Sequence, residues 1–221
     1  MKFFKRLLNK IESDINTKKQ DDSDIIFSLA SASISIEEKM GLQFSGNAAL
    51  CIKIINGSLF QNTIKDCTDL LEVSKDEFKF KYRTSVDSYN YIWFIIAAND
   101  TVSDPDIITN IAAGLSSIGD IIEENGFDDQ ILSAVFKYNF GNKEEAYYDE
   151  SKENYKDNNK NLYLIYNYKT NNFYPYIPSF NNKNDHQRDT TREMQALSIL
   201  KDLIPVEKDI TRWYPIKDIP F

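Results

Sequence analysis

Hydrophobic and polar positions follow two different periods along this chain. In two long stretches apolar residues recur every three to four positions, the spacing that buries one face of a helix. The stripe of the first predicted helix is Leu59, Phe60, Ile64, Cys67, Leu70 and Leu71. The stripe of the second is Ile107, Ile108, Ile111, Leu115, Ile118, Ile121 and Ile122. Ser58 can cap the first helix and Ser103 or Asp104 the second, and Gly126 ends the second by taking the left-handed conformation.

Other stretches have the β-branched, aromatic or alternating pattern of strands. The predicted strands cover residues 33–38, 48–55, 78–83, 89–98, 131–140, 162–169 and 173–177. Residues 91–96 are apolar on both faces, so we expect a central strand with Trp93 and Ile95 buried. Neighbouring strands that alternate with helices predict an α+β fold, with one mainly antiparallel twisted sheet and helices packed on one face.

The N-terminal residues predict an element of their own. Residues 1–17 predict an amphipathic helix with basic positions Lys2, Lys5, Arg6 and Lys10 and the apolar stripe Phe3, Phe4, Leu7, Leu8, Ile11 and Ile15. Such a helix can dock on its own domain. Alternatively it can lie on an anionic membrane, with contacts from Phe3, Phe4, Lys5, Arg6, Leu7 and Leu8. Residues 18–24 predict a polar linker, so that the chain divides into residues 1–24 and a single α+β domain at residues 25–221.

Residues 141–161 predict a long disordered hairpin loop. This stretch contains no Val, Ile, Leu or Phe and is dense in Lys, Glu, Asp and Asn. A segment of this composition cannot bury enough apolar surface to order itself.

Charge and cysteine content narrow the class of protein. The net charge of −8 argues against a nucleic-acid binder, which carries a basic face. Cys51 and Cys67 lie in apolar surroundings, and a secreted protein of this size more often carries a disulfide framework. We therefore predict two reduced core cysteines. No apolar run approaches the ~18–20 residues of a transmembrane helix, and the features of a signal peptide are missing, so we expect a cytoplasmic protein.

Candidate catalytic and metal-binding residues are few. His186 is the only histidine, and it lies in a polar loop without a nucleophile elbow. One histidine and two separated cysteines do not make a zinc ligand set, and neither a P-loop nor a G-x-G-x-x-G turn occurs. We therefore expect no catalytic residue, no metal and no cofactor, and a protein that is not an enzyme.

Paired opposite charges stand among aromatic residues and prolines in the last part of the chain. These charged residues are Arg188, Asp189, Arg192, Glu193, Glu207, Asp209 and Arg212. Thr190 and Glu193 have capping-box spacing, and the helix that follows would bury Met194, Leu197, Leu200 and Leu203. The charges can pin this helix and the tail against the sheet through Arg–carboxylate pairs. Alternatively they can line a polar groove for a peptide or another partner.

An ordered series of motifs carries a family resemblance over roughly residues 26–215. The motifs are Asp87-Ser88-Tyr89-Asn90-Tyr91-Ile92-Trp93, Phe173-Tyr174-Pro175-Tyr176-Ile177-Pro178, Arg188-Asp189, Glu193, Asp202-Leu203-Ile204-Pro205-Val206-Glu207-Lys208-Asp209 and Arg212-Trp213-Tyr214-Pro215. This series resembles the PspA-associated protein family PspAB.

The resemblance implies a small cytoplasmic protein linked with the PspA envelope-stress system, without enzymatic activity or cofactor. It implies a non-enzymatic binding or adaptor protein with a PspA-like protein partner and weak peripheral contact with anionic lipid at the inner membrane face. The candidate partner-binding or structural residues are Asp87, Tyr89, Trp93, Tyr174, Arg188, Asp189, Glu193, Glu207, Arg212 and Trp213.

Two alternative functions stay open. The order of elements also resembles secretion-chaperone-like or YbjN-like scaffolds, which favours a chaperone-like module that binds a client peptide. The other alternative is an enzyme with an unrecognised site.

Overall fold

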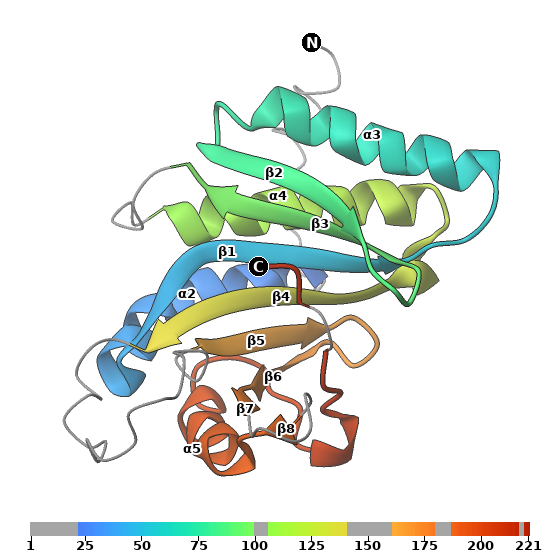
Figure 1. The fold of residues 1–221 in the computed structure, drawn as a ribbon. Helices are drawn as coiled ribbons and strands as arrows, with labels where there is room; N and C mark the ends of the chain where they lie inside the picture. The colour runs from blue at the N-terminus through green and yellow to red at the C-terminus, as the bar shows by residue number, and fades with distance from the viewer. Residues whose placement is uncertain (1–21, 100–105, 141–160, 180–186, 217–218) are drawn as a thin grey trace, which may run out of the picture.

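The computed structural model of the protein describes residues 22–99, 106–140, 161–179, 187–216 and 219–221. Its main sheet is antiparallel (Figure 1). The six strands lie in the order β2 (Phe80–Val86), β3 (Tyr91–Ala98), β1 (Leu42–Lys53), β4 (Ile131–Phe140), β5 (Asn161–Asn167) and β6 (Asn172–Tyr176). Two short strands, β7 (Pro178–Ser179) and β8 (Gln187–Arg188), pair with each other outside this sheet.

In the described part of the chain four helices accompany the sheet, which confirms the predicted α+β class. They are α2 (Asp22–Met40), α3 (Ser58–Ser74), α4 (Ile107–Glu124) and α5 (Thr190–Leu200). Helices α2, α3 and α4 cover one face of the sheet, and α5 lies beside β6 at the edge (Figure 1). The described residues also include two short 3-10 turns, η1 (Asp128–Gln130) before β4 and η4 (Ile210–Arg212) in the C-terminal segment.

Strand β3 separates two hydrophobic cores. Phe94 and Ile96 belong to the larger core under the helices, and Trp93 and Ile95 belong to a second core on the opposite face. Because successive residues of a strand point to opposite faces, a strand that is apolar throughout has to be covered on both sides. Trp93 is 1% exposed and Ile95 3% exposed, which confirms the predicted burial of both.

Residues 33–38 form part of helix α2, so the predicted short strand is wrong. The buried positions of α2 recur at helical spacing: they are Ile25, Ile26, Leu29, Ala32 and Ile36. The hydroxyls of Ser28 and Ser33 donate to backbone carbonyls of the preceding turn, so the serines are satisfied within the helix. The helix also begins at Asp22, so the last three residues of the predicted linker 18–24 are helical.

Helix α4 buries all seven residues of its predicted stripe. Gly126 follows it with φ +77°, as predicted. The helix begins at Ile107 with Asp106 as N-cap, while Ser103, Asp104 and Pro105 lie outside the described residues. Helix α3 is capped by Gly57 and not by Ser58, and no side chain makes the cap hydrogen bond. Ser58 cannot be the cap because it is already the first helical residue.

Strands β4 and β5 are antiparallel neighbours, with Asn139 opposite Asn161. The predicted loop at residues 141–161 therefore connects two adjacent strand ends. Asn161 is the first residue of β5, which shortens the loop by one residue. Residues 141–160 lie outside the described part of the chain.

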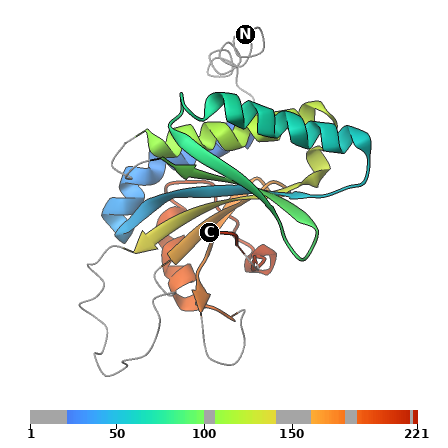
Figure 2. The same ribbon diagram turned by 45° about the horizontal axis from the view of Figure 1, so that its top comes forward.

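The C-terminal strap, defined here as residues 205–216 and 219–221, covers the face of the sheet opposite the helices. Val206 forms a parallel bridge with Phe173 of β6, and Trp213, Ile216, Ile219 and Phe221 pack in the second core. Arg83 of β2 donates to the carbonyl oxygen of Pro220, so the strap reaches the opposite edge strand. Figure 2 shows the three long helices on one side of the strands and the C-terminus on the other.

Candidate functional site

Arg188 connects three parts of the C-terminal region. Its Nε donates to Glu193 Oε2 at 2.7 Å, its Nη1 donates to the carbonyl oxygen of Trp213 at 2.7 Å, and its Nη2 donates to that of Pro175 at 3.4 Å. The guanidinium carbon lies 5.8 Å from the centre of the Tyr176 ring and 5.5 Å from that of Trp213, within the range of cation–π attraction. Arg188 therefore ties β6, α5 and the strap to one another.

Glu193 is the buried partner of Arg188. Its side chain is completely excluded from solvent, and its second oxygen, Oε1, accepts from the backbone N–H of Ile177 at 2.9 Å. Burial raises the pKa of Glu193, while the hydrogen bonds from Ile177 and Arg188 oppose that rise. The carboxylate points toward β6 and β8, so it is not available to the N-terminus of its own helix, and the predicted capping box is wrong.

Asp189 caps helix α5 in place of Thr190. Its Oδ1 accepts from the backbone N–H of Arg192 at 3.0 Å. The predicted apolar face is also wrong at Met194, which is 44% exposed. The residues that α5 buries are Glu193, Ala196 and Leu200. The ion pair between Arg188 and Glu193 turns this side of the helix inward.

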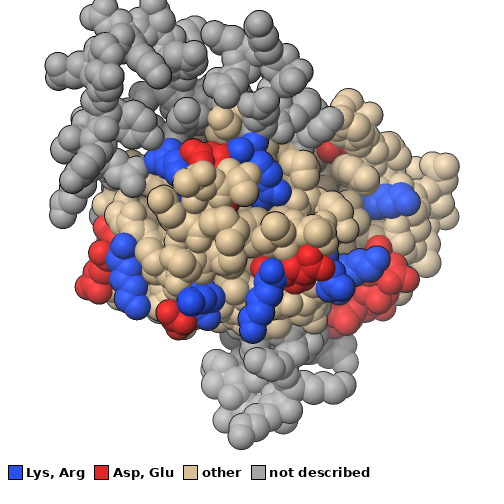
Figure 3. Space-filling view, turned by 90° about the horizontal axis from the view of Figure 1, so that it is seen from below, with Lys and Arg blue, Asp and Glu red and all other residues tan. Residues whose placement is uncertain are grey.

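The exposed face of α5 is uncharged over its first two turns. Its residues form a shallow surface and are Thr190, Thr191, Met194, Gln195 and Ser198. Figure 3 views the molecule from below, on the side where α5 lies, and shows a wide area without charged residues bordered by charges of both signs. A flat surface of this kind has no charge with which to select a partner.

Trp213 anchors the strap. Its Nε1 donates to the carbonyl oxygen of Glu207 at 3.0 Å, and its ring stacks on Tyr174 with centroids 6.2 Å apart. The Tyr174 hydroxyl donates to the carbonyl oxygen of Tyr214 at 2.9 Å. Burial raises the pKa of Tyr174, so this phenol keeps its proton at neutral pH. Glu207 also lies 3.8 Å from Arg212, whose largely exposed guanidinium makes this a weak pair.

Asp87, Tyr89 and Trp93 form a separate group at the turn between β2 and β3. Asp87 Oδ1 accepts from the backbone N–H groups of Tyr89 and Tyr91 at 2.9 and 3.0 Å. Its Oδ2 accepts from Trp93 Nε1 at 2.9 Å. Asp87 thus orders the turn, while Tyr89 at its tip is 51% exposed. The structure therefore divides the predicted site residues into this group and the C-terminal group around Arg188 and Trp213.

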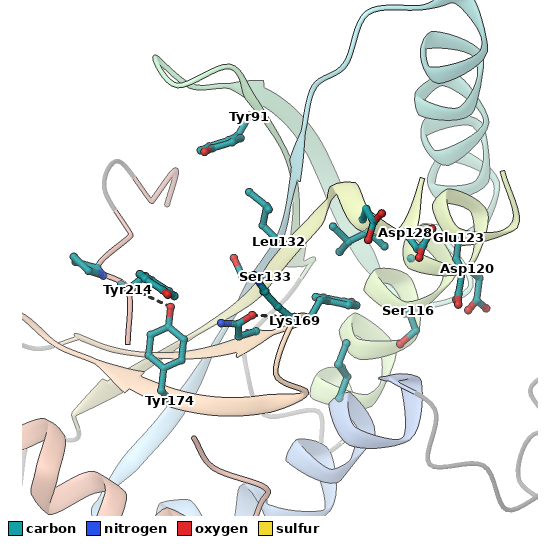
Figure 4. Close-up of a pocket in the computed structure, with 17 residues that line it drawn as sticks. Tyr91, Ser116, Asp120, Glu123, Asp128, Leu132, Ser133, Lys169, Tyr174 and Tyr214 are labelled. Atoms are coloured by element: carbon teal, nitrogen blue, oxygen red, sulfur yellow. Dashed lines mark hydrogen bonds between the residues drawn. The ribbon is translucent and has the colours of Figure 1, made fainter. Parts of the chain in front are cut away.

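A pocket of about 810 Å³ lies at the end of the sheet where β4 begins and β5 ends. We call it the end pocket. Its walls come from α2, α4, η1, the strands β3, β4, β5 and β6, the β5–β6 turn and the strap. Its tyrosines are Tyr91, Tyr168, Tyr174 and Tyr214, and its carboxylates are Asp120, Glu123, Asp128 and Asp129. Figure 4 shows Tyr91, Tyr174 and Tyr214 on one side and Asp120, Glu123 and Asp128 on the other.

The electrostatics of the end pocket favour a cation. Four carboxylates line it against one ammonium group, that of Lys169. Helix α4 also ends at the pocket, and its last turn contains no basic residue. The negative end of the helix dipole therefore adds to the field of the carboxylates. The Ser116 hydroxyl lines the same pocket, and no described residue hydrogen-bonds to its buried Oγ.

A smaller pocket of about 270 Å³ adjoins the end pocket. The two share Tyr91, Leu132, Ser133 and Pro215, and the smaller one also reaches Cys51 and the Asp87 turn. Burial raises the pKa of Cys51 to about 12, so its thiol stays protonated at neutral pH. A protonated thiol is a weak nucleophile and a weak metal ligand.

The end pocket suits a cationic group on an apolar stem. Its carboxylates can pair with an ammonium or guanidinium group, and its tyrosine rings can pack against the aliphatic part. In the described part of the chain, no group of three or more His, Cys, Asp and Glu side chains could hold a metal ion. None of the described helices is long and apolar enough to cross a membrane.

Sequence reasoning missed the end pocket. Its only local signal is the run of acidic residues around the end of α4, from Asp120 to Asp129. Its tyrosines come from β3, the β5–β6 turn, β6 and the strap, and the sheet topology alone brings these together.

The comparisons with known proteins place the chain in a family. No curated protein and no solved structure matches it. The model of the family PspAB, described as PspA associated protein B, matches residues 1–221. The chain therefore belongs to the PspAB family, whose description links it with PspA.

Proposed function

We propose that this protein is a non-enzymatic adaptor of a PspA-type membrane-stress response, acting in the cytoplasm and near the inner membrane face. Its end pocket is the surface that binds a protein partner, in the first instance a PspA-like protein. Family membership supports the link with PspA. The end pocket supports the choice of surface, because it is concave, acidic and lined by tyrosines.

The position of the tyrosines is the observation that carries this proposal. Tyr214 is 60% exposed at the pocket, and its backbone carbonyl is fixed by Tyr174. Tyrosine is enriched at protein interfaces because its rigid ring buries a large area while its hydroxyl keeps a polar partner. An exposed ring across the pocket from its carboxylates is suited to a partner that presents basic and apolar groups together.

The Arg188 group serves a different purpose in this proposal. Its polar groups bind one another: Glu193 is held by Arg188 and Ile177, and Trp213 is held by Glu207. These contacts hold the strap on the sheet, and the strap supplies Tyr214 and Pro215 to the pocket. The proposal therefore gives this group a positioning role and assigns no catalytic step to any residue.

Calorimetric titration with a purified PspA-type protein tests the proposal. The double variant Asp128→Asn/Asp129→Asn should bind about tenfold more weakly, which corresponds to about 1.4 kcal/mol. The control is Asp76→Asn/Glu77→Gln, which removes the same charge from another exposed acidic pair. That pair precedes β2, whose first residue pairs with Ala98 at the far end of β3 from Tyr91.

Three results are decisive. Weaker binding of the pocket variant with an unchanged control supports the proposal. Equal affinity of both variants for the partner would show that the partner binds to another surface of the protein. If the unaltered protein gives no heat of binding and does not co-elute with the PspA-type protein, that protein is not the partner.

A further inference from the structure

We propose that the end pocket binds the basic amphipathic segment at residues 2–17 of the same chain. This inference rests on the proposed function only in taking the end pocket as a binding surface. It adds an occupant that competes with any other ligand of that surface. Residues 1–21 precede the described part of the chain.

Charge complementarity is the first reason. Residues 1–11 contain Lys2, Lys5, Arg6 and Lys10 and no acidic residue. The lining of the pocket has the opposite excess, with four carboxylates against Lys169. The C-terminal end of helix α4, which is the negative end of its dipole, lies near the same place. A basic part of the chain therefore complements an acidic concave surface.

Apolar complementarity is the second reason. Ile26, Leu132 and Pro215 line the pocket together with its four tyrosines. The stripe of the segment, with Phe3, Phe4, Leu7, Leu8 and Ile11, presents bulky apolar side chains between the basic ones. A helix of 16 residues is about 24 Å long and about 10 Å across. A pocket of about 810 Å³ therefore accommodates one face of such a helix and not its whole body.

The covalent connection is the third reason. Helix α2 begins at Asp22, and its residue Ile26 lies in the wall of the pocket. Residues 18–21 can span at most about 14 Å, because each residue of an extended chain spans about 3.5 Å. The segment is therefore held close to the pocket at an effective concentration in roughly the millimolar range. Even weak complementarity is sufficient for occupancy at that concentration.

Zero-length carbodiimide cross-linking of the full chain tests this inference, because it joins an amine to a carboxylate only when the two are in contact. We expect amide links from Lys2, Lys5 and Lys10 to Asp120, Glu123, Asp128 and Asp129, identified by mass spectrometry. The Lys65–Asp69 ion pair on α3 is the internal positive control. Mixing isotope-labelled and unlabelled protein distinguishes links within one molecule from links between copies.

A variant makes the cross-linking test quantitative while it keeps some of the pocket carboxylates that can be linked. In Asp128→Asn/Asp129→Asn, the carboxylates of Asp120 and Glu123 are intact, so their links to the segment report on docking itself. Those links should fall about fivefold, the effect of losing two exposed ion pairs. They should stay unchanged in Asp76→Asn/Glu77→Gln, which loses the same charge at the opposite end of the sheet.

Other results would overturn the inference. These are links from the segment distributed equally over Asp66, Asp76 and Glu77, mixed-isotope links that make a second copy the occupant, and a segment that links to nothing. The experiment contains no partner protein, so its result is independent of the titration with a PspA-type protein. If the cross-links form but the PspA-type protein does not bind, the intramolecular contact stands and the proposed function fails. If the PspA-type protein binds but the cross-links do not form, the proposed function stands and the intramolecular contact fails.

Discussion

The Trp93 side chain contributes both to the second hydrophobic core and to the β2–β3 turn. Its ring is buried in the second core, and its indole N–H donates to Asp87 Oδ2 at 2.9 Å. The same carboxylate organises the β2–β3 turn through Tyr89 and Tyr91. Removal of the indole therefore leaves a cavity and also deprives Asp87 of one hydrogen-bond donor, two costs that have separate physical origins.

The substitution Trp93→Ala should lower the free energy of unfolding by about 3–5 kcal/mol, measured by urea denaturation. Tyr89→Ala is the matched control in the same turn, because the Tyr89 ring is largely exposed, and its effect should stay within about 0.5 kcal/mol. A loss below about 1 kcal/mol at Trp93 would mean that its ring is not part of a packed core.

At the scale of the element, helix α5 shows how a buried charge can decide a helix start. Thr190 and Glu193 have the spacing of a capping box, but Glu193 is engaged by Arg188 and Ile177. The helix therefore begins one residue earlier, with Asp189 as the cap. Glu193 therefore makes tertiary contacts in place of the hydrogen bond to the helix N-terminus that the local pattern predicts.

This cap gives a direct test of the two interpretations. Asp189→Ala should destabilise the protein by about 1 kcal/mol, the typical cost of losing an N-cap. Thr190→Ala should have almost no effect, since Thr190 is exposed and does not cap. Thermal unfolding of the two variants side by side measures the difference. A larger destabilisation by Thr190→Ala than by Asp189→Ala would show that Thr190 is the cap, as the capping-box pattern predicts.

Periodicity predicted those elements whose packing agrees with their local pattern. Helix α4 and strand β4 carry long, uninterrupted signals, and residues 131–140 coincide with the observed strand. Helix α2 was not predicted, and residues 33–38 within it were predicted as a strand, because its serines and β-branched residues favour a strand locally. Its buried positions do recur at helical spacing, and they pack against α4 and β1. The local preference of single residues for a strand was therefore overridden by tertiary packing.

At the scale of the whole molecule, the end pocket shows that the sequence alone also could not predict the candidate binding site. The charged and aromatic motifs near the C-terminus were visible in the sequence, and the structure places most of them in contacts with one another. The pocket draws its walls from residues as distant as Ile26 and Pro215. No motif contains it, so it could be recognised only after the topology had been established.

The connection between β4 and β5 should be dispensable for folding. These strands are adjacent and antiparallel, so a short Gly-Asn turn can join them in place of residues 141–160. The long loop adds only a modest closure entropy, so the free energy of unfolding should change by less than about 1 kcal/mol. Thermal denaturation of the shortened protein checks this, and failure to fold would show that the segment is structural.

The N-terminal segment and the end pocket together predict how the molecule responds to a membrane. Lys2, Lys5 and Arg6 can each contribute about 1 kcal/mol near an anionic surface, while the acidic body opposes the attraction. In a flotation assay with anionic vesicles at low salt, the full chain should therefore bind weakly, and Lys2→Glu/Lys5→Glu/Arg6→Glu should stay in solution.

Docking in the pocket adds a second expectation to the same assay, because the segment cannot occupy the pocket and the bilayer at once. Asp128→Asn/Asp129→Asn weakens the intramolecular site, so more protein should float than with the unaltered chain. Asp76→Asn/Glu77→Gln reduces the negative charge of the body equally but leaves the pocket intact. If both variants float to the same extent, the gain reflects net charge alone and the pocket does not compete. If only the pocket variant gains, the membrane and the end pocket share one ligand, and whatever displaces the segment from the pocket also releases it to the bilayer.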